Sequence, residues 1–252
     1  MKAVILAGGR GTRLSEETLL KPKPLVEAAG KPLLWHIMSN YALYGITEFI
    51  VLVGYKGNLI KEYFHNFWMN QTDITFDLSS PDRMILKSSG LTWKVTVLDS
   101  GMDTQTAGRL NYLRGFVGEK FLLTYGDGVS DVNISDLISS HDASQASVTL
   151  TAVQPPARFG ALSLKNNQII GFQEKPAGDG LWINGGHMVV DSKILETTHE
   201  LNSSFEFDVL PKLAEAGQLN AYFHTGNFIA VDTIRDLGRL EELIHSKAFR
   251  WI

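Results

Sequence analysis

The sequence predicts an α/β fold: a mixed, mostly parallel sheet with helices on both faces and a partly antiparallel second half. In the first half, short apolar runs suited to buried strands alternate with helical patterns, which favours parallel strands joined by crossovers. After residue 155, strand patterns follow one another directly, which is typical of antiparallel pairing. The chain has 252 residues, 44% of them hydrophobic, and this is enough for one sizeable core.

The first half begins with an apolar run at residues 2–7, which predicts a strand buried on both faces. Similar runs predict strands at residues 49–53, 95–99, 121–125 and 147–153. Helical spacing predicts helices at residues 33–43, 59–68 and 107–116, the first with Pro32 near its first turn. Between residues 69 and 94 the periodicity fades, and we expect a small hairpin or a subunit contact outside the main sheet.

In the second half, the pattern predicts strands at residues 161–164, 169–173, 183–190, 219–223 and 228–231. Two helices are expected, at residues 208–216 and 233–244. The chain shows no internal repeat and no low-complexity tract. We therefore expect one domain that spans residues 1–252.

Composition excludes several classes of function. The formal net charge is −4, so there is no basic excess to bind nucleic acid. Cysteine is absent, which excludes disulfides, cysteine–zinc sites and thiol catalysis. No stretch approaches the roughly 18 consecutive apolar residues of a membrane span. We expect a soluble, cytoplasmic protein.

A glycine-rich loop directly follows the first strand. Gly8, Gly9 and Gly11 allow close approach to a ligand and point backbone N–H groups at it. The first 31 residues carry six basic and three acidic side chains, so positive charge gathers where the glycines are. Leu14 and Pro32 break the dinucleotide-binding and P-loop patterns respectively. The loop therefore predicts a polyphosphate site of another kind, with an ordinary strand-to-helix turn as the alternative.

Two aspartates follow predicted strands at the edge where ligands of parallel sheets bind. Asp127 stands between two glycines after the strand at residues 121–125, and Asp232 follows the strand at residues 228–231. A carboxylate beside phosphates needs a divalent cation, and Mg²⁺ binds through one or two carboxylates plus substrate phosphates. The alternative for each is a turn or a helix N-cap, above all for Asp232, which precedes a predicted helix.

The sequence shows no Ser–His–Asp pattern and no histidine cluster with ligand spacing. A phosphate monoester is largely a dianion at neutral pH, because its second pKa is about 6. A reaction with that nucleophile needs positioning and charge neutralisation rather than a general base. We expect His36 to be packed or interfacial.

Seven short motifs occur in order, at residues 7–14, 21–25, 30–34, 126–127, 158–160, 174–176 and 232–233. This ordered set resembles the signature of sugar-1-phosphate nucleotidylyltransferases. Further segments are most similar to the glucose-1-phosphate cytidylyltransferase branch, namely residues 15–18, 35–38, 54–57, 60–64, 106–110, 124–128 and 183–186.

The resemblance implies a Rossmann-like, nucleotide-diphospho-sugar transferase-like fold. Residues 1–154 would form the nucleotide-binding half, and residues 155–252 the sugar-binding half with the C-terminal helix. The implied reaction converts CTP and α-D-glucose 1-phosphate into CDP-glucose and pyrophosphate, with Mg²⁺ as cofactor, for polysaccharide biosynthesis. A homo-oligomer, trimer or hexamer, is also implied, with no nucleic-acid or membrane partner.

The resemblance also assigns roles. Arg13 and Lys23 are the catalytic residues: Arg13 stabilises the departing β,γ-phosphates, and Lys23 neutralises the α-phosphate. Asp127 and Asp232 hold Mg²⁺. Nucleotide contacts are expected at Leu6, Ala7, Gly8, Gly9, Gly11, Thr12, Thr104, Arg109 and Gly126. Sugar contacts are expected at Gly160, Glu174, Lys175 and Asn184.

Two segments, residues 205–208 and 226–228, match the family less closely. Two alternatives also stay open. The first is the same chemistry with UTP, dTTP or another sugar phosphate, because a few backbone contacts can distinguish the pyrimidine bases. The second is a non-catalytic nucleotide-sugar sensor, which predicts loss of the charged phosphate-handling residues; in this chain they are present.

Overall fold

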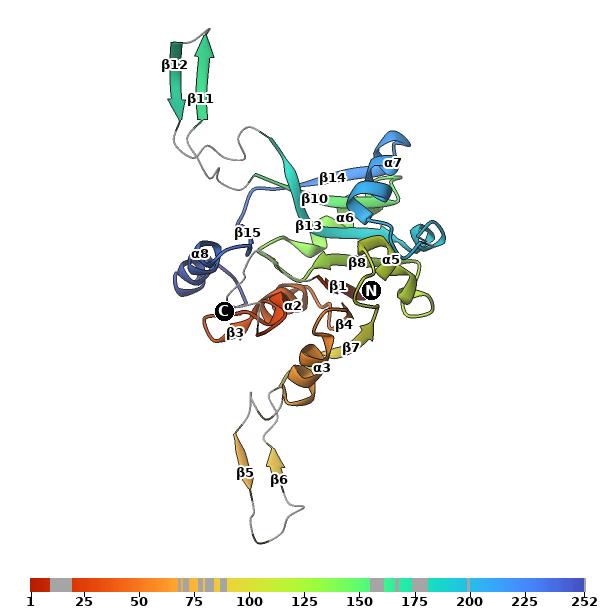
Figure 1. The fold of residues 1–252 in the computed structure, drawn as a ribbon, viewed down its shortest axis with the longest axis vertical. Coiled ribbons are helices and arrows are strands. Elements are labelled where there is room, and N and C mark those ends of the chain that lie inside the picture. The colour runs from red at the N-terminus through yellow and green to blue at the C-terminus, as the bar shows by residue number, and fades with distance from the viewer. Residues whose placement is uncertain are drawn as a thin grey trace.

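The computed structural model describes residues 1–9, 20–67, 69, 73–76, 79, 84–86, 90–154, 161–165, 168–173, 181–198 and 200–251. Its centre is a seven-stranded sheet in the order β14-β10-β13-β8-β1-β4-β7 (Figure 1). These strands are β1 (Ala3–Ala7), β4 (Glu48–Val53), β7 (Lys94–Asp99), β8 (Lys120–Tyr125), β10 (Val148–Val153), β13 (Ile183–Asp191) and β14 (Leu219–His224).

The sheet is mixed and mostly parallel, as predicted. Strands β8, β1, β4 and β7 run parallel to one another, and β14 runs parallel to β10. Strand β13 lies between β8 and β10 and is antiparallel to both. The antiparallel character expected of the second half therefore enters the main sheet through β13.

Strand β1 shows why the sheet is covered on both faces. All five of its residues are buried, and alternate side chains enter two separate cores. Ile5 packs in a core shared with helices α2 (Leu33–Leu43), α3 (Gly57–His65), α6 (Ile134–Ala143) and α8 (Ile234–His245). Val4 packs in the other, with α5 (Thr106–Leu110), η4 (Ser192–Glu196) and α7 (Leu210–Glu215). An unbroken apolar run is what such a strand requires.

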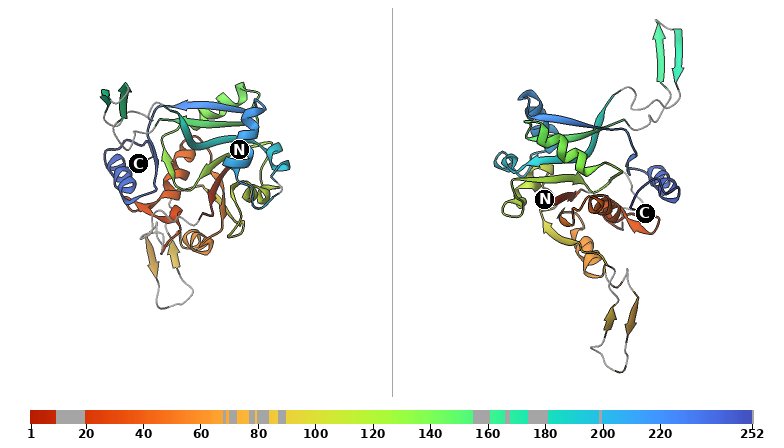
Figure 2. Two further views of the ribbon diagram at one scale, coloured as in Figure 1. Left: turned by 45° about the horizontal axis from the view of Figure 1, so that its top comes forward. Right: turned by 180° about the vertical axis from the view of Figure 1, so that it is seen from behind.

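Four short antiparallel pairs complete the described structure. They are β2 (Glu27–Ala28) with β3 (Lys31–Pro32), β5 (Ile74–Phe76) with β6 (Met84–Leu86), β9 (Gly128–Ser130) with β15 (Phe228–Ala230), and β11 (Ala161–Lys165) with β12 (Gln168–Gln173). The β5–β6 and β11–β12 pairs project from the main sheet in opposite directions (Figures 1 and 2). The former lies in the predicted excursion at residues 69–94.

The helices of the structure differ from the expected ones in several places. Helix α6 was not predicted, although Asn133 caps it by accepting a hydrogen bond from the Asp136 backbone. Helix α5 ends at Leu110 and continues only as the short 3₁₀ helix η2 (Asn111–Leu113). A π-helix, η5 (Phe205–Val209), precedes α7 where the sequence predicts one continuous helix.

Within the described part of the chain, no helix combines the length and apolar character that a membrane crossing needs.

Candidate active site

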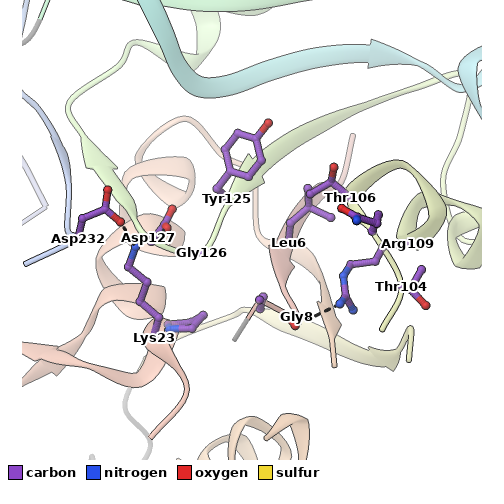
Figure 3. Close-up of a pocket in the computed structure, with 14 residues that line it drawn as sticks. Leu6, Gly8, Lys23, Thr104, Thr106, Arg109, Tyr125, Gly126, Asp127 and Asp232 are labelled. Carbon is purple, nitrogen blue, oxygen red and sulfur yellow. Dashed lines mark hydrogen bonds and ion pairs between the residues drawn. The ribbon is translucent and has the colours of Figure 1, made fainter. Parts of the chain in front are cut away.

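A cavity of about 380 Å³ opens where β1 and β8 end (Figure 3). Its lining residues come from the glycine loop, η1 (Lys23–Leu25), the approach to α5, and the turns after β8 and β15. They are Leu6, Ala7, Gly8, Gly9, Lys23, Pro24, Thr104, Gln105, Thr106, Arg109, Tyr125, Gly126, Asp127 and Asp232. The two sequence regions predicted to hold phosphates and metal therefore face one cavity.

Glycines at the strand ends allow close packing around this cavity. The backbone N–H of Gly126 donates to the carbonyl of Leu6 at 2.9 Å, which ties the end of β8 to the end of β1. A Cβ atom at Gly126 would lie 2.8 Å from the Pro24 side chain, and one at Gly8 only 2.1 Å from Nη1 of Arg109. A larger residue at either position would displace a neighbour.

Arg109 holds the backbone around the glycine loop. Its Nη1 donates to the Ser100 hydroxyl at 2.7 Å and to the Gly101 carbonyl at 2.9 Å, and its Nη2 donates to the Gly8 carbonyl at 3.1 Å. The side chain is only 4% exposed, and burial lowers the pKa of the guanidinium, an effect that Asp99 opposes. Arg109 therefore fixes the cavity wall as well as lining it.

Lys23 bridges the two predicted metal ligands. Pro22 and Pro24 flank it and fix its backbone at the start of η1. The ammonium nitrogen lies 2.7 Å from Oδ2 of Asp127 and 2.7 Å from Oδ1 of Asp232. Burial alone would lower the pKa of Lys23, but the two carboxylates outweigh it and raise the pKa above its usual range. The lysine therefore stays charged at neutral pH.

The β9–β15 pair brings the two aspartates together from sequence positions more than a hundred residues apart. Gly128 pairs with Ala230, and beyond that pair the Val231 backbone N–H donates to the Asp127 carbonyl at 3.0 Å. Asp232 is not the cap of α8: Thr233 is, in a capping box with Asp236. The capping alternative for Asp232 is therefore wrong, and its carboxylate faces the cavity.

The donor set at this point suits Mg²⁺. Two carboxylates converge on one cationic nitrogen, so oxygen atoms from both reach a single position. Hard oxygen donors of this kind bind Mg²⁺ when substrate phosphates and water supply the remaining ligands. Among the described residues, no group of three or more histidine, aspartate or glutamate side chains is placed to hold a metal ion.

A third carboxylate, that of Asp131, stabilises the end of the β9–β15 pair that lies away from the cavity. Asp131 accepts hydrogen bonds from the backbone and the side-chain amide of Asn227, at 2.7 and 2.8 Å, and lies 2.9 Å from Nε2 of His224. Although burial raises the pKa of Asp131, these partners outweigh it and lower the pKa. A Cβ at Gly226 would lie 2.4 Å from Oδ1 of Asp131, so glycine is needed for this close approach.

The sequence analysis did not identify the carboxylate of Glu206, in η5, or its two partners in the cavity lining. The hydroxyls of Tyr125 and Thr106 both donate to Glu206, Thr106 at a distance of 2.6 Å. The position of Tyr125 directly before Gly126 could have identified it. Nothing in the sequence pattern marks Glu206, because its segment matches the family less closely.

The predicted residues are placed as follows. Ten line the cavity: Leu6, Ala7, Gly8, Gly9, Lys23, Thr104, Arg109, Gly126, Asp127 and Asp232. Asn184 lies at the start of β13, where its side-chain oxygen accepts a hydrogen bond from the Gly186 backbone at 2.8 Å, and it lies near the Tyr125 hydroxyl. The remaining six, Gly11, Thr12, Arg13, Gly160, Glu174 and Lys175, lie outside the described residues.

Two buried histidines, His36 and His187, are structural. His36 is buried and hydrogen-bonds the Ala28 carbonyl at 2.9 Å, as expected of a packed residue. His187 is 1% exposed and hydrogen-bonded with Tyr41 and Ser130, and burial lowers its pKa to about 3. Neither ring lines the cavity.

A phosphate-type glycine loop, a lysine and two converging carboxylates at the strand ends define a nucleotidyltransferase-like site. The chain belongs to the nucleotidyl transferase family, which it matches over residues 2–250. The resemblance drawn from the motifs is thereby confirmed.

Curated relatives match along the whole chain. Glucose-1-phosphate cytidylyltransferase of Salmonella typhimurium is 46% identical over 253 residues, covering 100% of this chain and 98% of the relative. A probable glucose-1-phosphate cytidylyltransferase of Bacillus subtilis is 44% identical over 239 residues, covering 94% and 93%.

A solved structure confirms the fold. HddC from Yersinia pseudotuberculosis superimposes with a TM-score of 0.71 at 24% identity, covering 96% of this chain and 99% of that one. A putative glucose-1-phosphate thymidylyltransferase from Bacillus anthracis gives 0.67 at 22% identity, covering 96% and 94%.

Proposed function

We propose that this protein transfers the cytidylyl group of CTP to α-D-glucose 1-phosphate, forming CDP-glucose and pyrophosphate. The contact of Lys23 with both Asp127 and Asp232, in the cavity that begins at Gly8, carries the proposal. Lys23 supplies a fixed positive charge, and Asp127 and Asp232 would be the metal ligands, beside a loop suited to phosphates. The two cytidylyltransferase relatives support the choice of substrates.

In the proposed reaction, a phosphate oxygen of glucose 1-phosphate attacks the α-phosphorus of CTP. A new phosphorus–oxygen bond forms as the bond to the β-phosphate oxygen breaks, and pyrophosphate leaves with that electron pair. Lys23 neutralises charge that develops at the α-phosphate, and its pKa, raised by the two carboxylates, keeps it protonated for this role. The attacking dianion needs no general base, and none of the described lining residues is a histidine.

Asp127 and Asp232 would hold Mg²⁺. When bound, the ion would neutralise phosphate charge and align the reacting groups. Asp127→Asn should raise the Mg²⁺ concentration needed for half-maximal rate by about tenfold, since a charged ligand becomes neutral. Asp142→Asn, at an exposed ion pair with Lys120, is the matched control. An unchanged Mg²⁺ requirement in Asp127→Asn would remove Asp127 from the metal site.

The remaining assignments rest on the family resemblance. The loop from Leu6 to Thr12, with Thr104, Arg109 and Gly126, would hold the nucleotide, and Arg13 would stabilise the leaving pyrophosphate. The sugar would bind at Gly160, Glu174, Lys175 and Asn184. All of these sites belong to one catalytic unit in this proposal, and strands from both halves of the chain share the main sheet.

The test of the reaction is pyrophosphate release from the purified protein with glucose 1-phosphate, Mg²⁺ and each of CTP, UTP, dTTP, ATP and GTP in turn. Release with CTP alone is expected. Release with another nucleotide instead would keep the chemistry and overturn the base choice. If no pyrophosphate were released with any of the five nucleotides, the result would contradict the proposal and favour another sugar phosphate or a non-catalytic sensor.

We also propose that the chain forms a homo-oligomer, a trimer or hexamer. Exposed apolar side chains on β12 support this, since Ile169, Ile170 and Phe172 are 58%, 60% and 66% exposed. Light scattering coupled to size-exclusion chromatography measures the mass directly. A monomer at micromolar concentration would contradict this proposal and leave the proposed reaction unaffected.

A further inference from the structure

One carboxylate behind the cavity wall is the shared acceptor of three hydroxyl groups. Oε1 of Glu206 accepts a hydrogen bond from the Tyr125 hydroxyl, and Oε2 accepts from Thr106 at 2.6 Å and from Ser204 at 2.9 Å. Both oxygens are therefore occupied. Tyr125 and Thr106 line the cavity, and Glu206 reaches the cavity through them.

The two hydroxyls belong to opposite parts of the candidate site. Tyr125 ends β8 and directly precedes Gly126 and Asp127, at the metal end. Thr106 begins α5, the helix that carries Arg109 at the other end. Figure 3 shows the Tyr125 ring between Asp127 on one side and the segment from Thr106 to Arg109 on the other. Glu206 thus ties together the two ends of the cavity wall.

The local backbone is built around this contact. Glu206 lies in the π-helix η5, a rare conformation that is frequent at functional sites. Ser204 caps η5 by accepting from the Phe207 backbone, and the Phe205 backbone donates to Thr106 at 2.8 Å. Helix α5 and η5 are therefore joined by a side-chain and a backbone contact at the same threonine.

The Tyr125 contact is direct. Its hydroxyl donates a hydrogen bond to Oε1 of Glu206, and the same side chain lines the cavity. The Asn184 side chain, from the predicted sugar region, lies near this hydroxyl.

We propose that Glu206 is a positioning residue for substrate binding: through Tyr125 and Thr106 it fixes the cavity wall against which the nucleotide binds. This inference rests on the proposed function and adds a residue to it. Glu206 contacts no reacting atom in this account. Its loss therefore weakens binding of substrate and transition state alike, rather than the chemical step at Lys23.

The experiment compares Glu206→Ala, Glu206→Gln, Tyr125→Phe and the double variant Glu206→Ala/Tyr125→Phe in the full chain. Calorimetric titration with CTP in the presence of Mg²⁺, without sugar phosphate, measures the Kd. Glu206→Ala should raise the Kd by about tenfold or more, because hydrogen bonds to a charged group are lost. Glu206→Gln should retain most of the affinity, since its carbonyl accepts from Thr106 and Ser204 while its amide faces Tyr125. The double variant should be less impaired than the product of the two single effects.

Kinetics and a matched control separate positioning from folding. Glu206→Ala should raise the KM for CTP while changing kcat much less. Asn133→Ala, which removes the cap of α6, is a destabilised control that should leave the Kd unchanged. A Glu206→Ala protein that is less stable but keeps the wild-type Kd would overturn the proposal, as would multiplicative effects in the double variant. If the wild-type protein binds another nucleotide and not CTP, the base choice fails, and the same variants test Glu206 with that nucleotide.

Discussion

The backbone N–H of Val231 donates a hydrogen bond to the carbonyl oxygen of Asp127 at 3.0 Å. This bond joins the residue before Asp232 to Asp127 itself, so it fixes how close the backbones of the two aspartates lie. The β9–β15 pair continues the ladder away from the cavity, and Asp131 fastens its far end. The predicted metal ligands therefore depend on a segment that does not line the cavity.

Gly226→Ala tests this dependence. The added methyl group would lie 2.4 Å from Oδ1 of Asp131 and 2.6 Å from Cε1 of His224. We expect a loss of about 1–3 kcal/mol in the free energy of unfolding, measured by urea denaturation, because the Asp131 hydrogen bonds are disturbed. The Mg²⁺ concentration for half-maximal rate should rise as well. Gly118→Ala is the control, since nothing lies within 4 Å of that position. If both variants showed the same stability and the same Mg²⁺ requirement, the contacts of Asp131 would not position the proposed metal ligands.

Lys23→Met should lower turnover by about a hundredfold or more, because the charge proposed to neutralise the α-phosphate is lost. It should also destabilise the protein by about 1–3 kcal/mol, since Asp127 and Asp232 then face each other without a cation. Mg²⁺ should offset part of that destabilisation, which a thermal melt with and without the ion measures. Lys21→Met is the control, because that lysine forms an exposed ion pair with Glu27. Normal turnover in Lys23→Met would contradict the assigned role.

Arg109→Lys should destabilise the protein by roughly 2–4 kcal/mol, because one ammonium cannot serve the separated acceptors that a buried guanidinium serves. The Gly8 carbonyl would lose its partner, so the KM for the nucleotide should rise. Denaturant unfolding and steady-state kinetics measure the two effects. The comparison is Arg114→Lys, at an exposed arginine that donates to the Leu195 carbonyl. A wild-type KM in a destabilised Arg109→Lys protein would limit Arg109 to a structural role.

Stability should fall as the pH falls below about 6.5, in part through His187. In the unfolded chain its pKa is the ordinary 6.5, whereas burial lowers it to about 3 in the folded state. Between these two pKa values the unfolded state binds a proton that the folded state does not. The free energy of unfolding therefore falls by up to about 1.4 kcal/mol for each pH unit in this range. Urea unfolding of the wild type and of His187→Asn at about pH 7 and about pH 5 measures this, and the variant should show the smaller loss. Equal losses would show that His187 is not the group responsible.

The sequence predicted most of the main sheet because its strands are buried on both faces and appear as unbroken apolar runs. Helix α6 escaped because its buried residues are few, Ile134, Leu137 and His141, among polar neighbours. For the site, the positions of Asp127 and Asp232 after strands were enough to predict that both lie at one edge of the sheet, whereas the role of Lys23 came from the family resemblance.

What the sequence could not show is how side chains pair across long separations. The bridge from Lys23 to both aspartates spans 104 and 209 positions, and no local pattern encodes it. Likewise, Thr233 rather than Asp232 caps α8, because the threonine hydroxyl and Asp236 complete the capping box. The contacts of Glu206 could not be predicted from the sequence, because its partners Tyr125 and Thr106 lie 81 and 100 positions away.

The most direct test of the account is the stereochemical course at the α-phosphorus. One diastereomer of CTP carrying sulfur on the α-phosphate would be turned over with glucose 1-phosphate, and the configuration of the product determined by phosphorus NMR. Direct in-line attack by the sugar phosphate, with Lys23 acting only through its charge, predicts inversion. Retention would mean that the cytidylyl group is first transferred to a residue of the protein, and would contradict the mechanism.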